Sequence, residues 1–301
     1  MFYANLKALL EQEISCIKRK VCMIPMNHPI SSSSIPPVQP ASRLELLDTI
    51  RGLTLISMIL YHACWDLVYL HGAGKGFTLW YQSFSAFLWQ QSICWTFILL
   101  SGFCAPLSRH ALRRSLSVFL SGALVTAATL IVTPESRVIF GILTFLGSAG
   151  IATALLRAAC RKIRRKAAPH SPGESLPALL AALCLSFWLF LAFLNIQSGV
   201  LRILPGITLP LPASLYHGYP ATFFGFQDPS FWSTDYFPFF PWYFLYLTGY
   251  WLSRLLSAAG LLSGRHRILH AGLPALSWLG RHSLPLYLIH QPILYGIFLL
   301  V

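Results

Sequence analysis

Long apolar blocks alternate with short polar or Pro- and Gly-rich segments through most of the chain. Each block is about 20 residues long, the length of α-helix that crosses the hydrocarbon core of a bilayer. The pattern lacks the short alternating segments that are typical of a transmembrane β-barrel. The sequence therefore predicts an all-α fold, a polytopic transmembrane helix bundle with about seven spans, at residues 50–70, 86–107, 116–133, 138–156, 176–195, 237–256 and 276–300.

The composition agrees with a membrane location. Of the 301 residues, 55% are hydrophobic and only 10% are charged, and the mean hydropathy is +0.62. A soluble domain would carry roughly 25% charged residues. Ionisable side chains inside the predicted spans are therefore exceptional, and each one is a candidate for function.

The formal charge of +13 comes from Lys and Arg residues that gather in alternate connections. With the N-terminus inside, 18 of the 22 basic residues lie on the inner side, and three (Lys75, Arg137 and Arg202) lie outside. Cytoplasmic loops of membrane proteins carry such an excess. We therefore expect a cytoplasmic N-terminus, and membrane lipid rather than nucleic acid as the partner of the basic residues.

Two segments differ from the spans in composition. Residues 1–42 end in the Ser/Pro run SSSSIPPVQP, and we expect a cytoplasmic tail and linker without a signal peptide, followed by a membrane domain at 43–301. Residues 196–236, between the fifth and sixth spans, are rich in Pro, Gly and aromatic residues. A long loop of this aromatic content argues against disorder and predicts an ordered cap on the exterior surface.

His62 and Asp66 are the first candidates for chemistry, because both fall inside the first span. Four residues apart, they share one face of a helix and can touch. His62 is eleven residues beyond Arg51, about 16 Å along a helix, which is near the middle of a bilayer. We expect a general base whose ring is oriented by Asp66; the alternative is a neutral histidine bonded to a carbonyl.

His290 lies at a similar depth in the seventh span, nine residues beyond Arg281, so it and His62 can face one cavity. It is the third catalytic candidate, and a core histidine is the alternative. Arg51, Arg281 and His282 lie where the inner leaflet meets the apolar core. They are candidates for binding the phosphates of an acyl donor, or for ordinary anchoring at the interface.

Asp235 and His71 are the candidates for binding an acceptor on the exterior side. Asp235 precedes the sixth span and can bind a hydroxyl or an amine, or it can be a helix N-terminal charge. His71 lies near the outer end of the first span, where a plain surface position is equally consistent with the sequence. The seven cysteines form no CxxC pair, so neither a disulfide framework nor a metal site is predicted.

Five segments of the chain resemble a known family of membrane enzymes. RLELLDTIRGLTLISMILYH is similar to the opening helix of the heparan-α-glucosaminide N-acetyltransferase catalytic domain family. The segments FILLSGF, FGILTFLG, FGFQDPSFWSTDYFPFFPW and LGRHSLPLYLIHQPILYG follow in matching order. The resemblance covers residues 43–300. The spacing R-x4-D-x2-RG-x9-H also resembles the wider membrane acyltransferase superfamily.

The resemblance implies transfer of an acetyl group from cytosolic acetyl-CoA, without a metal, to an amine or hydroxyl of a glycan or lipid-linked sugar at the exterior face. It implies that His62 stands at the reaction centre, with His71 an approximate counterpart of a loop histidine in lysosomal members. A bacterial member would lie in the inner membrane, where a homo-oligomer is left open.

Two alternatives remain. One is a proton-coupled transporter or lipid-linked-sugar-binding protein, in which the buried ionisable residues form a proton relay; the sequence lacks the inverted repeat that such a transporter often has. The other is a non-catalytic family member that acts as a membrane partner.

Overall fold

The computed structural model describes residues 44–167, 175–262 and 267–299, and the predicted tail and linker at 1–42 lie outside these ranges. The predicted all-α class is confirmed, because helices make up most of the described chain. The α-helices are α2 (Glu45–Tyr69), α3 (Lys75–Tyr81), α4 (Phe84–Cys104), α5 (Ala111–Val132), α6 (Ile142–Ala167), α7 (Leu176–Phe193), α8 (Gly218–Phe224), α9 (Phe239–Ala258), α10 (Arg267–His270), α11 (Pro274–Arg281) and α12 (Ser283–Leu299).

Within the described ranges, five helices are long and apolar enough to cross a membrane: α2, α4, α5, α6 and α7. They correspond to the first five predicted spans, and they identify a multi-pass membrane protein. The sixth and seventh predicted spans correspond to α9 and α12, which fall outside this set. Helix α12 has only 17 residues, and α9 carries several Tyr and Trp residues and Arg254. The count of seven and the orientation therefore remain predictions.

The expectation of one continuous helix at residues 276–300 is wrong. Helix α11 ends at Arg281, and α12 begins at Ser283 after a non-helical His282. Pro285 supplies a reason, because its ring cannot donate to the carbonyl of Arg281 and would clash with it in a continuous helix. In the observed arrangement Pro285 lies in the first turn of α12, where a missing N–H costs nothing.

Glycines allow two pairs of helices to cross with their backbones in contact. A Cβ on Gly280 of α11 would overlap the carbonyl oxygen of Asp48 on α2, and a Cβ on Gly52 would overlap that of Leu276. Gly102 of α4 and Gly249 of α9 form a second reciprocal pair against each other's helices. Small residues at such crossings are typical of helix packing inside membranes, where van der Waals contact replaces the hydrophobic effect.

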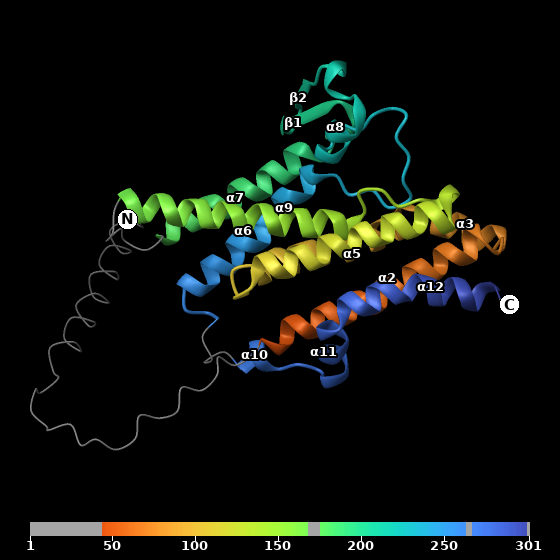
Figure 1. Cartoon of the computed structure of the whole chain (residues 1–301), viewed down its shortest axis with the longest axis horizontal. Helices are drawn as coiled ribbons and strands as arrows, with labels where there is room; N and C mark the ends of the chain where they lie inside the picture. The colour runs from red at the N-terminus through yellow and green to blue at the C-terminus, as the bar shows by residue number, and fades with distance from the viewer. Residues whose placement is uncertain (1–43, 168–174, 263–266, 300–301) are drawn as a thin grey trace, which may run out of the picture. The chain divides into compact units, whose positions relative to one another are not determined.

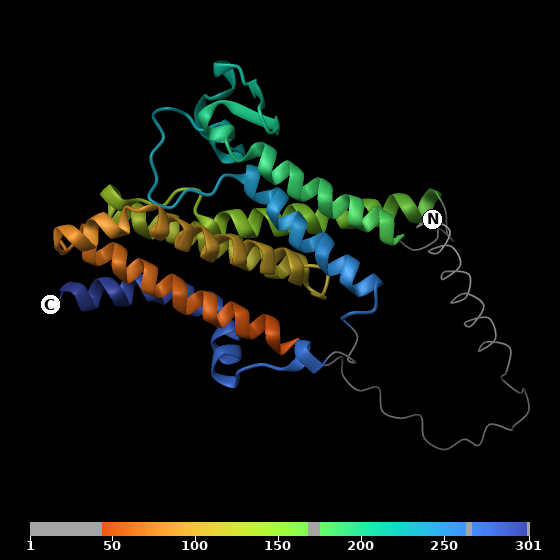
Figure 2. The same ribbon diagram turned by 180° about the vertical axis from the view of Figure 1, so that it is seen from behind.

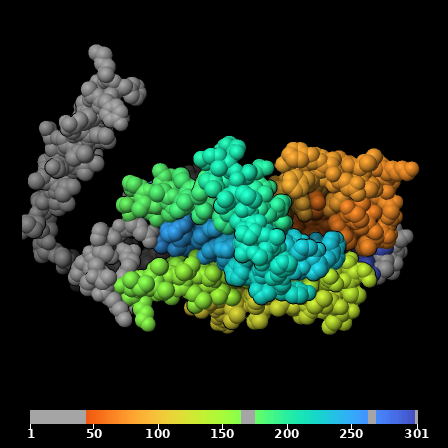
Figure 3. All heavy atoms as spheres, turned by 90° about the horizontal axis from the view of Figure 1, so that it is seen from above, coloured from red at the N-terminus to blue at the C-terminus, as the bar shows by residue number. Residues whose placement is uncertain are grey.

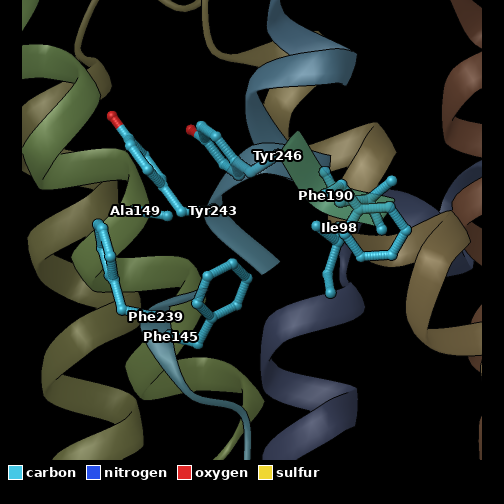
Figure 4. Close-up of a cluster of buried hydrophobic side chains, with 8 residues drawn as sticks. Ile98, Phe145, Ala149, Phe190, Phe239, Tyr243 and Tyr246 are labelled. Carbon is cyan, nitrogen blue, oxygen red and sulfur yellow. The ribbon is translucent and has the colours of Figure 1, made fainter. Parts of the chain in front are cut away.

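The main apolar core lies where α4, α6, α7 and α9 meet (Figure 4). Phe190 and Phe145 are almost completely buried there, and Phe239 stacks on Tyr243 with ring centroids 4.5 Å apart. Helices α2 and α12 run side by side (Figures 1 and 2). The core therefore fixes α4 and α6, and α2 and α12 form the wall that faces them.

Residues 196–236 form a small folded segment near the end of α7 (Figure 1). It contains the antiparallel strands β1 (Val200–Leu204) and β2 (Ile207–Pro210), in which Leu201 pairs with Leu209, followed by α8. The indole N–H of Trp188 on α7 donates to the carbonyl of Ile203, at 3.1 Å, and ties the hairpin to the bundle. The segment is thus folded, and its exterior location remains a prediction.

Asp228 stabilises the start of α8. Its carboxylate accepts hydrogen bonds from the backbone N–H of Gly218 at 2.7 Å and from the N–H and hydroxyl of Ser230 at 2.9 and 2.6 Å. These bonds, with the one from Gly218 first, lower the pKa of Asp228 to about 2. Asp228 therefore has a structural role that explains its place in the loop.

Candidate active site

One large cavity, of about 1370 Å³, lies between α2 and α12 on one side and α4, α5 and α6 on the other, and reaches Asp235. Pockets for small ligands typically measure about 300 to 1000 Å³, so this one has room for an extended molecule. Seen from above (Figure 3), the surface is hollowed between the cyan segment that precedes α9 and the orange residues of α2 to α4. All three predicted catalytic residues line the cavity.

Five arginines gather at one end of this cavity. They come from the start of α2, the start of α5 and its preceding loop, and the second half of α6: Arg51, Arg109, Arg113, Arg114 and Arg157. The N-terminus of α5, with unpaired backbone N–H groups, adds positive potential at the same place. This end, called here the arginine end, is suited to an anion.

Arg51 is held in a fixed position at the arginine end. One guanidinium nitrogen donates to Oδ1 of Asp48 at 3.2 Å, which is the partner that its spacing of three residues allows, and another approaches Sγ of Cys104 at 3.2 Å. Arg157 donates to the carbonyl of Ala105 at 3.2 Å. These contacts tie α2, α4 and α6 together around the cavity and leave Arg109, Arg113 and Arg114 as its exposed cations.

His62 and His290 face each other in the middle of the cavity. Their ring centroids are 5.0 Å apart, although the residues belong to different helices. The depth estimate from helix rise is therefore matched by the structure. His62 keeps part of its surface open to the cavity, whereas His290 is buried.

The hydrogen bond of His290 determines where its proton lies. Nδ1 is at hydrogen-bond distance from the carbonyl oxygen of Tyr287, which can only accept. Nδ1 therefore carries the proton in the neutral ring, and Nε2 carries a lone pair. Nε2 is buried and has no hydrogen-bond partner among the described residues. His290 thus presents an unprotonated nitrogen that can accept a proton.

Asp66 pairs with Gln291 of α12 and forms no hydrogen bond with His62 in the described structure. The amide nitrogen of Gln291 donates to Oδ1 of Asp66 at 3.0 Å. Oδ2 of Asp66 and Oε1 of Gln291 are buried and lack partners among the described residues. Together with Nε2 of His290, they are three acceptors that neighbouring protein atoms cover, on residues that line the cavity.

Asp235 lines the other end of the cavity, near the end of α5 and the start of α6. Oδ2 accepts the backbone N–H of Ile142 at 3.1 Å, so this carboxyl serves the N-terminus of α6 rather than that of α9. Burial raises the pKa of Asp235 to about 6, and the bond from Ile142 opposes that rise. Part of the side chain remains open to the cavity, which allows contact with a ligand.

The other three predicted site residues lie outside the cavity lining. Arg281 is exposed, and its Nε donates to the carbonyl of Ser277 at 3.1 Å. The exposed ring of His282 packs against Trp278, and that of His71 against Phe298. Their roles in binding donor or acceptor remain predictions.

Sequence reasoning missed Arg109, Arg113, Arg114 and Arg157 as site residues, because their positions in connections made them markers of topology. Gln291 lies beside His290 as a polar residue in an apolar span, and this feature of the sequence could have identified it as a site residue. Among the described residues, no three His, Cys, Asp or Glu side chains are arranged to hold a metal ion.

A bundle of apolar helices around a polar cavity defines this chain as a multi-pass membrane protein with a site between its spans. Residues 43–167 and 178–292, more than three quarters of the chain, match the family described as heparan-alpha-glucosaminide N-acetyltransferase, catalytic. The chain belongs to this family, as its motifs indicated, and the family is one of membrane acetyltransferases. No curated protein and no solved structure matches the chain.

Proposed function

We propose that this protein transfers an acetyl group from acetyl-CoA to an amine or hydroxyl of a glycan or lipid-linked sugar. One observation carries the proposal: a single cavity joins five arginines at one end to Asp235 at the other, with the two histidines between them. A donor and an acceptor can therefore enter from opposite ends and meet at His62 and His290.

The donor is assigned to the arginine end. Phosphate groups favour charge-assisted hydrogen bonds from guanidinium groups and helix N-termini. His62 is about 16 Å from Arg51 along α2, so an elongated donor is needed to bring a thioester from one to the other. With the orientation predicted from the Lys and Arg distribution, the arginine end faces the cytosol. The membrane proposed for the protein is a bacterial inner membrane.

The acceptor is assigned to the region of Asp66, Gln291 and Asp235. Asp235 keeps part of its side chain open to the cavity, and its carboxylate suits a ligand that brings N–H or O–H donors. A site whose buried acceptors remain unpaired without such donors discriminates against molecules that lack them. Amines and sugar hydroxyls supply those donors.

His290 then acts as the general base. The acceptor gives its proton to Nε2 of His290 as its nitrogen or oxygen attacks the thioester carbonyl carbon. A ring N–H of His62 donates to the carbonyl oxygen, where negative charge develops. The new C–N or C–O bond forms, the C–S bond breaks, and the proton passes from His290 to the departing CoA thiolate.

The direct test uses the purified protein in liposomes with radiolabelled acetyl-CoA and a glucosaminide acceptor. We expect label in the acceptor, and loss of transfer in His62→Ala. His217→Ala is the matched control, because His217 is exposed and lies outside the cavity. Equal transfer by His62→Ala would refute the site, and proton-dependent uptake of the glucosaminide without acetylation would favour the transporter.

A further inference from the structure

The cavity has an apolar side between α5 and α12. Its lining there includes Leu124, Ala128 and Val132 on α5 and Leu288 and Tyr295 on α12. Leu124 is 63% exposed, Val132 is 74% exposed and Tyr295 is 40% exposed. Side chains on a closed wall would be covered, so residues that line the cavity and remain this exposed mark an opening. These five residues are called the seam.

Helix α5 has little cover on its outer side. Only 6% of its span is buried, compared with between 28% and 39% for the other four candidate spans. It packs along α6 and meets α12 only over a short stretch. A single helix therefore separates much of the cavity from the surroundings, and in a membrane those surroundings are hydrocarbon.

The seam opens on the acceptor half of the cavity. Leu124, Ala128 and Val132 lie in the second half of α5, which leads to Thr133 and the Asp235 end, away from the arginines at its start. On α12, Leu288 is two residues before His290, and both residues line the cavity. An apolar chain in the seam would thus end near the facing rings of His62 and His290.

The chemistry of these two regions identifies an amphiphile. An apolar slot suits a hydrocarbon chain, whereas the partly open side chains of His62 and Asp235 suit a polar headgroup with N–H or O–H donors. We propose that the acceptor is carried on a long hydrocarbon chain, which lies in the seam between α5 and α12 while its polar head reaches His290. This inference rests on the proposed acetyl transfer and narrows its substrate class to lipid-borne acceptors.

Two glucosaminides test the inference in liposomes: the hexadecyl glycoside and the methyl glycoside, which carry the same amine and hydroxyls. The seam variant is Leu124→Trp, and its matched control is Leu120→Trp, which is one turn away, 58% exposed and outside the cavity lining. We expect Leu124→Trp to raise KM for the hexadecyl acceptor at least about tenfold and to leave the methyl acceptor unchanged. Equal effects on both acceptors, or no effect on either, would overturn the proposal that the seam holds the hydrocarbon chain of the acceptor.

A second measurement does not depend on acetyl transfer. A hexadecyl glucosaminide with a photoreactive diazirine in its chain is irradiated with the protein, and the labelled residues are mapped. Label concentrated at the seam, and displaced by unlabelled hexadecyl glucosaminide, supports the inference. If neither acceptor is acetylated in spite of such labelling, the proposed enzyme activity fails and the lipid site stands. Label spread evenly over Leu116, Leu120 and Leu124 would overturn the inference.

Discussion

Two substitutions of His290 test the roles of its two ring nitrogens one at a time. The structure predicts a different result for each. In His290→Asn the side-chain amide nitrogen can occupy the place of Nδ1 and keep the hydrogen bond to Tyr287, but nothing replaces Nε2. In His290→Gln the amide can reach the place of Nε2, where it cannot accept a proton, and the bond to Tyr287 is lost. Both variants should therefore lose the base, and only the Gln variant should lose the bond.

The magnitudes follow from these two losses. Loss of a general base lowers kcat by about 10² to 10⁴, which corresponds to roughly 3 to 5 kcal/mol of activation free energy. Loss of one hydrogen bond lowers the free energy of unfolding by about 1 kcal/mol. We expect His290→Asn to lose activity with a wild-type thermal midpoint, and His290→Gln to lose activity with a lower midpoint.

The assay is single-turnover acetyl transfer at saturating donor, with thermal midpoints measured on the same preparations. The limb of the pH profile that reports protonation of the base should vanish in His290→Asn and persist in His62→Asn, because His62 is assigned to the carbonyl oxygen. A kcat for His290→Asn within tenfold of wild type would refute the assignment of the base.

Three further predictions concern the donor, the helix crossing and pH. Arg113→Gln should raise KM for acetyl-CoA about ten- to a hundredfold without changing kcat, since a hydrogen bond to a charged group is worth about 1.5 to 3 kcal/mol. Initial rates measure this KM, and an unchanged value would show that Arg113 does not bind the donor. Gly280→Val should lower the free energy of unfolding by roughly 1 to 3 kcal/mol, whereas Gly296→Val, with no atom within 4 Å of its Cβ, should not; equal thermal midpoints would contradict the crossing. Asp235 has a pKa of about 6 and is ionised only above it, so KM for the acceptor should fall as pH rises through 6, and Asp235→Asn should abolish that change. The pKa of Asp235 is raised in the folded protein, so the stability that its protonated form contributes is lost as pH rises through about 6. Asp235→Asn should therefore raise the thermal midpoint more at pH 7.5 than at pH 5. A difference in midpoint that does not depend on pH would contradict ionisation of Asp235 in this range.

The helices of the bundle follow from the sequence, because twenty apolar residues in a row leave a membrane helix few alternatives. The break at His282 did not follow in the same way. Both α11 and α12 are apolar enough to read as parts of one span, and the consequence of Pro285 depends on whether a turn of helix precedes it. Pro292, by contrast, lies inside α12 without ending it. The presence of a proline therefore does not by itself predict whether a helix ends there or continues through it.

The candidate site was predictable where it depends on distance along a helix. The rise per residue gave His62 and His290 similar depths, and the rings lie 5.0 Å apart. The partner of Asp66 was not predictable, because the rule of four residues points to His62, whereas the observed partner is Gln291, 225 residues away. Contacts of that kind arise from the packing of α2 on α12, which no local spacing encodes.

The three buried acceptors explain why the cavity is more than a gap between helices. A buried polar atom without a partner costs about 1 to 3 kcal/mol, and Oδ2 of Asp66, Oε1 of Gln291 and Nε2 of His290 each carry that cost among the described residues. Apolar side chains would avoid it, and most of the other side chains of α2 and α12 are apolar. With Asp66 ionised all three atoms accept, so pairing them requires a proton on Asp66 or an N–H or O–H donor from another molecule. Under the proposed mechanism, a preference for molecules with N–H or O–H groups would thus lie beside His290, the base that removes the proton.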